Sequence, residues 1–144
     1  MKIVAQRVIE SSVEVDNKIV GKSGHGLMLL VSFTHTDTLE NVDYMVKKVL
    51  GLRIFDDENG VMNKSVLDVG GSILSISQFT LYADTKKGNR PSYINALNGE
   101  EAVKLYDAFN DKLKEQIHVE TGIFGAEMKV SLINDGPVTI ILEK

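Results

Sequence analysis

The chain has 144 residues, of which 43% are hydrophobic and 25% are charged, and its formal net charge is −4 at pH 7. This length and composition predict a single globular domain over residues 1–144, and the negative charge argues against a general nucleic-acid binder, which is usually basic. The absence of cysteine excludes disulfides, thiolate nucleophiles and cysteine-based metal sites, and it fits the reducing cytoplasm.

The distribution of apolar residues also argues against export and membrane insertion. No run approaches the ~20 apolar residues that span a membrane. Charged side chains follow Met1 too early for the apolar core of a signal peptide. We therefore expect a cytoplasmic protein with no membrane partner.

The first half of the chain is predicted to consist mainly of strands. Residues 26–33 form an apolar run that is typical of a strand buried on both faces. Asp37 and Glu40 resemble a capping box, and apolar residues at helical spacing follow them. The predicted elements are strands over residues 2–8, 12–15, 19–20, 26–33 and 53–55, a turn at 16–18 and a helix over 38–50.

The second half is predicted to contain another buried strand, a second helix and two closing strands. An apolar run after Gly70 and Gly71 predicts the strand, and Asn98 with Glu101 predicts the start of the helix. The predicted elements are a strand over residues 72–82, an irregular connection over 83–97, a helix from 98 with an apolar face reaching Ile117, and strands over 126–133 and 138–142.

Strands therefore outnumber helices, and the two amphipathic helices must cover a sheet. Because some strands are apolar on both faces, the opposite face of that sheet must be covered as well. The residues alone predict an α/β or α+β domain of about three layers.

Familiar catalytic and metal-binding patterns are absent. His25, His35 and His118 are not at metal-ligand spacing, and the acidic turn at residues 56–60 lacks the spacing of a calcium loop. There is no Gly-x-Ser-x-Gly motif and no Walker or dinucleotide glycine pattern. We therefore predict no metal and no cofactor.

Polar residues in two segments have either a structural role or a role in binding a ligand. Ser77, Gln78 and Thr80 lie at the end of the predicted strand over 72–82, where buried polar groups need partners from neighbouring backbone or from a ligand. In a strand, Ser77 would share a face with Phe79, and Gln78 would share the other with Thr80. The sequence Asn-Asp-Gly-Pro-Val-Thr at 134–139 is typical of a tight turn between two strands.

Together, Ser-Gln-Phe-Thr-Leu at 77–81 and Asn-Asp-Gly-Pro-Val-Thr at 134–139 resemble the motifs of the D-aminoacyl-tRNA deacylase (D-tyrosyl-tRNA deacylase) family. The resemblance extends over nearly the whole chain. It includes residues 6–8, 52–55, 62–63, 87–88, 90–92 and 121–126.

The resemblance implies an enzyme that hydrolyses the ester bond between a D-amino acid and tRNA. It implies an α/β fold with a three-layer mixed β-sheet domain, in the order helices, sheet and second sheet. It also implies a homodimer with active sites at the subunit interface, and the 3′ end of aminoacylated tRNA as the partner.

For catalysis, the resemblance points to Ser77, Gln78, Phe79 and Thr80. Thr80 carries a hydroxyl, but no His, Asp or Lys lies near it in sequence to serve as its base. An aminoacyl ester is already activated by its α-ammonium group and the ribose hydroxyl. A site that orients the ester and stabilises the oxyanion with backbone N–H groups would therefore suffice. The family is thought to use such backbone contacts together with the ribose 2′-hydroxyl, so we expect Phe79 and Thr80 to act mainly through their main chain.

For selectivity, the resemblance points to Gly136 and Pro137. Glycine permits close approach and proline fixes the backbone, so the pair suits a rigid wall that faces the α-carbon of the substrate. The family resemblance implies a cis peptide bond here and a chirality filter that enters the active site of the partner subunit. Because such a filter excludes L-residues sterically, achiral glycyl-tRNA is a second candidate substrate.

Four further residues are assigned to substrate binding. By resemblance, Gly122, Phe124 and Met128 belong to a pocket for the terminal adenine, although core packing explains Met128 equally well. Arg7 lies in an otherwise apolar strand, so it is either exposed at an edge or paired, and its position in the family implies that it supports the Gly-Pro loop.

Two questions stay open at the level of sequence. Lys86, Lys87 and Arg90 form either a phosphate-binding patch or an ordinary solvated loop. The alternatives to a D-aminoacyl-tRNA deacylase are a non-catalytic module that binds the tRNA end, and a related editing deacylase with a different specificity.

Overall fold

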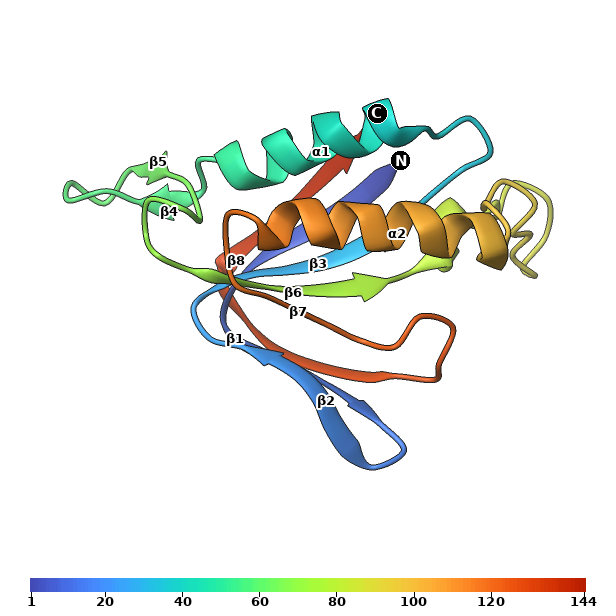
Figure 1. The fold of residues 1–144 in the computed structure, drawn as a ribbon, viewed down its shortest axis with the longest axis horizontal. Helices are drawn as coiled ribbons and strands as arrows, with labels where there is room; N and C mark the ends of the chain where they lie inside the picture. The colour runs from blue at the N-terminus through green and yellow to red at the C-terminus, as the bar shows by residue number, and fades with distance from the viewer.

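A computed structural model describes residues 1–144, and Figure 1 shows two helices lying side by side over one face of a sheet. The elements in chain order are β1 (Lys2–Val15), β2 (Lys18–Ser23), β3 (Gly26–Ser32), α1 (Leu39–Gly51), β4 (Phe55–Asp56), β5 (Met62–Lys64), β6 (Ser72–Ser77), the 3₁₀ helix η1 (Phe79–Tyr82), α2 (Gly99–Lys114), β7 (Val119–Thr121) and β8 (Lys129–Glu143).

Both predicted helices are confirmed; the first begins differently, and the second ends at Lys114, before the predicted Ile117. In α1 the side chain of Asn41 accepts a hydrogen bond from the Thr38 N–H at 3.0 Å, so Thr38 and Asn41 form the cap that was predicted for Asp37 and Glu40. Asp37 instead binds the N–H of Thr34. In α2 the Asn98 side chain accepts from the Glu101 N–H at 3.1 Å, as predicted.

Six strands form one mixed sheet in the order β2-β1-β3-β6-β7, with β8 on the free side of β1. The implied second sheet is therefore not separate. β1 and β8 have 14 and 15 residues and pair with each other over most of their length, so they continue from the half under the helices into the half that curls away from them. A Cβ at Gly21 of β2 would lie 2.6 Å from the carbonyl oxygen of Thr121 in β7, so the two outer strands approach and nearly close the sheet.

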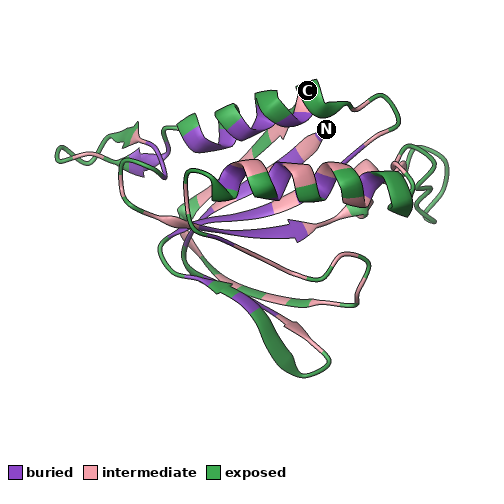
Figure 2. Ribbon diagram, in the orientation of Figure 1, coloured by how far each residue is buried: buried purple, intermediate pink, exposed green.

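The core has two parts, one on each face of the sheet. Twenty-one buried residues pack between the helices and the sheet, among them Leu27, Leu29 and Ile73. On the opposite face a smaller cluster lies inside the curl of the sheet: Val8, Val13, Met28, Leu74 and Ile76. β3 and β6 are therefore buried on both faces, as their apolar runs predict, and Figure 2 shows both strands as buried.

The strand predicted over residues 72–82 ends at Ser77, which corrects the predicted alternation of faces beyond that point. The neighbouring strand β3 ends at Ser32, and the Gln78 N–H makes the last backbone hydrogen bond to it, at Val31 O (2.8 Å). Beyond this point the chain bonds to itself as η1, including a bond from Ala83 N–H to Thr80 O.

The turn predicted at residues 134–139 is a bulge inside a single strand. Gln6 pairs with Thr139 and Val8 pairs with Asn134, so the four residues 135–138 lie opposite the single residue Arg7. The two predicted closing strands are thus the two parts of β8, which begins at Lys129 and not at the predicted Ala126. In the same way, the first two predicted strands are parts of β1, and the hairpin turn to β2 is confirmed by positive φ angles at Asp16 and Asn17.

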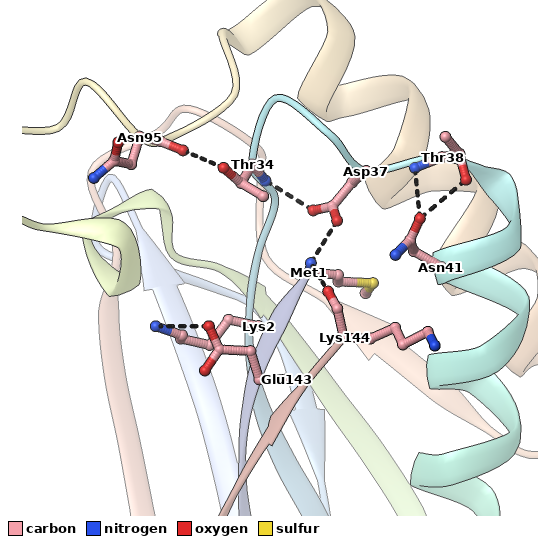
Figure 3. Close-up of polar contacts among 9 residues, drawn as sticks. All are labelled: Met1, Lys2, Thr34, Asp37, Thr38, Asn41, Asn95, Glu143 and Lys144. Atoms are coloured by element: carbon pink, nitrogen blue, oxygen red, sulfur yellow. Dashed lines mark hydrogen bonds and ion pairs between the residues drawn. The ribbon is translucent and has the colours of Figure 1, made fainter.

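The amino group of Met1 is buried in a polar network that joins the ends of the sheet to two loops (Figure 3). It donates to Asp37 Oδ1 at 2.5 Å and to the carbonyl oxygen of Lys144 at 2.7 Å. Asp37 Oδ2 accepts from the Thr34 N–H, and the Thr34 hydroxyl donates to Asn95 O at 2.6 Å. This network fixes the loop that precedes α2. Neither helix has the length and hydropathy that crossing a membrane requires.

Candidate functional site

A cavity of about 550 Å³ opens where β3 and β6 end, below the first turn of α2. Its walls come from four segments: the ends of β3 and β6 with Gln78 and Phe79, the loop before α2, the start of α2, and the segment that leads into the start of β8. The lining residues are Val31, Ser32, Phe33, Ile76, Ser77, Gln78, Phe79, Tyr93, Ala96, Leu97, Gly99, Ala102, Phe124, Gly125, Ala126, Met128 and Val130.

None of these lining residues is Asp, Glu, Lys, Arg or His. The cavity therefore offers no carboxylate, imidazole, amine or guanidinium group from its own walls. Moreover, no group of three or more His, Cys, Asp or Glu side chains is placed to hold a metal ion anywhere in the chain. The polar side chains that line this cavity are those of Ser32, Ser77, Gln78 and Tyr93, and its other polar groups belong to the backbone.

The predicted catalytic residues lie on one wall of the cavity. Ser77, Gln78 and Phe79 line it, and Thr80 follows in η1. The Gln78 side-chain amide donates to the Thr80 hydroxyl oxygen at 2.5 Å, so the hydroxyl is bonded to an amide and not to a base. Phe79 and Thr80 begin a 3₁₀ helix, whose first N–H groups have no partner inside the helix. The N–H groups of Phe79 and Thr80 therefore have no acceptor within η1 itself.

The predicted adenine-binding residues lie on the opposite wall. Phe124 and Met128 line the cavity. Gly122 lies behind them, where a Cβ would collide with the Met128 sulfur. Phe124 also packs on the ring of Tyr106 in α2, with centroids 5.6 Å apart and an interplanar angle of 50°. Burial raises the pKa of Tyr106 above its usual value, so its hydroxyl is a neutral donor at pH 7.

Arg7, Gly136 and Pro137 lie away from this cavity, at the bulge of β8. Arg7 is buried, which answers the question left by the sequence: it is paired. Its Nη1 donates to Ile54 O at 2.7 Å, and its Nε lies 3.3 Å from Asp135 O and 3.1 Å from Asp135 Oδ2. Its guanidinium packs directly against Gly136.

Asn134 holds the two ends of the bulge together. Its side-chain amide donates to Arg7 O and to Val138 O, each at 3.0 Å. Between these anchors Gly136 and Pro137 are exposed to solvent, and the peptide bond between them is cis, as the resemblance implied. The bulge therefore presents a braced backbone segment on the surface of the molecule.

Sequence reasoning missed the wall built by the loop before α2 and by α2 itself. Tyr93, Ala96 and Leu97 of that loop line the cavity, and so do Gly99 and Ala102 of the helix. Tyr93 also packs edge-on against Phe79, with ring centroids 5.0 Å apart. The available signal was the apolar content of residues 93–97 inside an otherwise polar loop. Lys86, Lys87 and Arg90, in the same connection, are exposed and do not line the cavity.

Comparison with known proteins identifies relatives over the whole chain. A family model described as D-Tyr-tRNA(Tyr) deacylase matches residues 4–143. A D-aminoacyl-tRNA deacylase of Bacillus cytotoxicus is 56% identical over 144 residues, which cover 99% of each chain.

Two solved structures share the fold. One, described as a c-Myc DNA unwinding element binding protein, is 40% identical with a TM-score of 0.95, and the match covers 100% of this chain and 99% of the other. The second, from a structural analysis of a probable eukaryotic D-amino acid tRNA deacylase, has a TM-score of 0.84 over 98% of this chain and 97% of the other. At 18% identity it supports the fold alone.

The bent mixed sheet, its two helices and these relatives place the protein among the deacylases, a class of hydrolases. The chain belongs to the D-Tyr-tRNA(Tyr) deacylase family.

Proposed function

We propose that this chain hydrolyses the ester bond between a D-amino acid and the 3′ end of tRNA in the cytoplasm, releasing the free D-amino acid and tRNA. The observation that carries the proposal is the uncharged cavity, which has Gln78 and the start of η1 on one wall and Phe124 on the other. The relative from Bacillus cytotoxicus, 56% identical and named for this activity, supports it.

One wall of the cavity binds the terminal adenine, and the other holds the ester that is hydrolysed. The terminal adenine lies against Phe124 and Met128, since stacking of a base on an aromatic ring contributes ~1–3 kcal/mol. This places the ester beside Ser77, Gln78 and the start of η1. There the N–H groups of Phe79 and Thr80 stabilise the developing oxyanion, and the ribose 2′-hydroxyl of the substrate assists the attack of water. No step requires a side-chain base or a cofactor.

Thr80→Ala is therefore expected to keep most of the turnover. The Thr80 hydroxyl is bonded to the Gln78 amide and has no base beside it, so its loss removes a neutral hydrogen bond, a loss of ~0.5–1.5 kcal/mol. Single-turnover release of D-tyrosine from tRNA should slow by less than ~10-fold, since 1.4 kcal/mol corresponds to a factor of ten. Abolished turnover with intact substrate binding would restore Thr80 as a nucleophile and refute the backbone mechanism.

We propose further that Gly136 and Pro137 form the chirality filter of a homodimer and enter the cavity of the partner subunit. In one chain the cavity and the exposed bulge are separate, and the bulge is braced by Arg7 and Asn134. A second copy of the chain would bring its own bulge to the cavity of the first copy. Sedimentation of the purified protein at micromolar concentration tests the assembly, and a monomer that is fully active and selective would refute it.

The function itself is tested by release from matched D- and L-tyrosyl-tRNA, with glycyl-tRNA as a third substrate. We expect fast release of the D-ester and the glycyl ester, slow release of the L-ester, and no effect of a chelator. Equal release from the D- and L-esters would contradict the filter and favour an editing deacylase of different specificity. Binding of tRNA without any release would identify a non-catalytic module that binds the tRNA end.

A further inference from the structure

Tyr106 lies behind the cavity, in α2, and contacts both of its main walls. The residue is 3% exposed and does not line the cavity itself. Its hydroxyl donates to the carbonyl oxygen of Ser75 in β6 at 2.8 Å, and its ring packs against Phe124. One side chain thus touches the strand that leads into Ser77 and the aromatic residue of the opposite wall.

The hydroxyl contact fixes the end of β6. Ser75 lies two residues before Ser77, and its carbonyl oxygen also accepts from the Gly122 N–H at 3.2 Å. A single oxygen atom therefore joins β6, α2 and the segment that carries Phe124. Tyr106 is held in turn by Asn110, whose side-chain amide donates to Tyr106 O at 2.9 Å. Because the Tyr106 hydroxyl is neutral at pH 7, its hydrogen bond to Ser75 O persists over the physiological pH range.

The ring contact fixes Phe124. Phe124 is only partly buried, and its ring meets Tyr106 on one side and the cavity on the other. Tilted aromatic pairs at 4.5–7 Å are favourable beyond the area they bury. Removing the Tyr106 ring would leave Phe124 without this support and free to change rotamer.

We infer that Tyr106 is a positioning residue that sets the distance between the ester-binding wall and the adenine-binding wall: its hydroxyl aligns the end of β6, and its ring orients Phe124. This inference rests on the proposed function for the names of the two walls. The two contacts themselves do not depend on it.

The hydroxyl is tested with Tyr106→Phe, which keeps the ring on Phe124 and leaves Ser75 O bonded to Gly122 N–H. For release of D-tyrosine from tRNA, we expect kcat to fall ~5-fold to 10-fold, as for the loss of one buried hydrogen bond, and KM to change by less than ~2-fold. The matched control is Val46→Ala in α1, a buried change in the same core at a residue that does not itself line the cavity. Equal changes in the two variants would reduce Tyr106 to a structural residue and overturn the inference.

The ring is tested with Tyr106→Leu. The probe is a non-hydrolysable amide, 3′-deoxy-3′-(D-tyrosylamino)adenosine, titrated calorimetrically. We expect Tyr106→Leu to weaken its binding and Tyr106→Phe to leave it unchanged, because only the first variant removes the support of Phe124. Equal affinities for both variants and the wild type would overturn the ring's part of the inference.

Hydrogen exchange separates a failure of this inference from a failure of the proposed function. In Tyr106→Phe the amides of residues 76–82 should exchange faster than in the wild type, whereas Val46→Ala should not change them. This readout needs no substrate, so it tests the positioning of β6 even if the wild type releases no amino acid from tRNA. Unchanged exchange in Tyr106→Phe would overturn the claim that the hydroxyl aligns β6.

Discussion

Replacing Gly136 with alanine is expected to abolish most of the discrimination between D- and L-aminoacyl esters. An alanine Cβ would lie 2.9 Å from Arg7 Nη2 and 2.9 Å from Val138 Cγ2, and residue 136 has a φ of +117°, which L side chains rarely adopt. Such backbone strain costs ~1–3 kcal/mol, so the bulge must move away from Arg7. The ratio of kcat/KM for D- and L-tyrosyl-tRNA should fall by ~10-fold or more, since 1.4 kcal/mol corresponds to a factor of ten.

The matched control for this variant is Gly60→Ala, in the turn between β4 and β5. Gly60 also has a positive φ, +73°, but a Cβ there meets nothing within 4 Å. It should therefore lower stability through backbone strain and leave the D-to-L ratio unchanged. A folded Gly136→Ala variant with the wild-type ratio would mean that the bulge is not the filter.

The second large effect is expected at Asp37, and it concerns stability. Asp37 and the amino group of Met1 form an ion pair in which both partners are almost fully buried, with side-chain exposures of 1% and 0% (Figure 3). Removing one partner of a buried pair leaves an unpaired charge and costs ~3–5 kcal/mol. Asp37→Asn should lower the free energy of unfolding by this amount in urea titrations, a large part of a total of ~5–15 kcal/mol.

Glu143→Gln provides the comparison, because Glu143 pairs with Lys2 at 3.4 Å in the same region but is 61% exposed. An exposed pair contributes at most ~1 kcal/mol. If the two variants lose the same free energy, the Met1–Asp37 pair contributes no more than a surface pair. Asp37→Asn should also loosen the loop before α2, since Asp37 holds Thr34, which in turn bonds to Asn95.

Helices and strands that depend on a local pattern of apolar residues could be predicted from the sequence. The spacing of Val42, Met45 and Val49 is enough to define α1, and the unbroken apolar run of β3 reflects burial on both faces. The end of β6 could not be predicted, because it depends on where the neighbouring strand β3 stops. The continuity of β8 through residues typical of a turn depends on its pairing with β1, more than 110 residues earlier in the chain.

The candidate site was harder to predict from the sequence than the fold. Ser77, Phe79 and Phe124 were assigned by resemblance, since nothing in the local pattern of residues brings the end of β6 to residue 124. The structure brings these three residues to one cavity. The wall formed by Tyr93 was missed because it depends on Thr34 and Asp37, which fix its loop from another part of the chain. The separation of the bulge from the cavity is a property of the fold that no single segment encodes.

The pairing of the first strand with the last has a consequence for synthesis on the ribosome. Arg7 emerges early, but Asp135 and Gly136, which it braces, belong to the last strand. Contacts of such sequence separation form late, because a long loop must close before they stabilise the chain. Most residues of the cavity wall precede β8 in the sequence, whereas the bulge forms only when β8 pairs with β1. Most residues of the cavity wall are therefore synthesised before the segment that is proposed to discriminate between D- and L-esters.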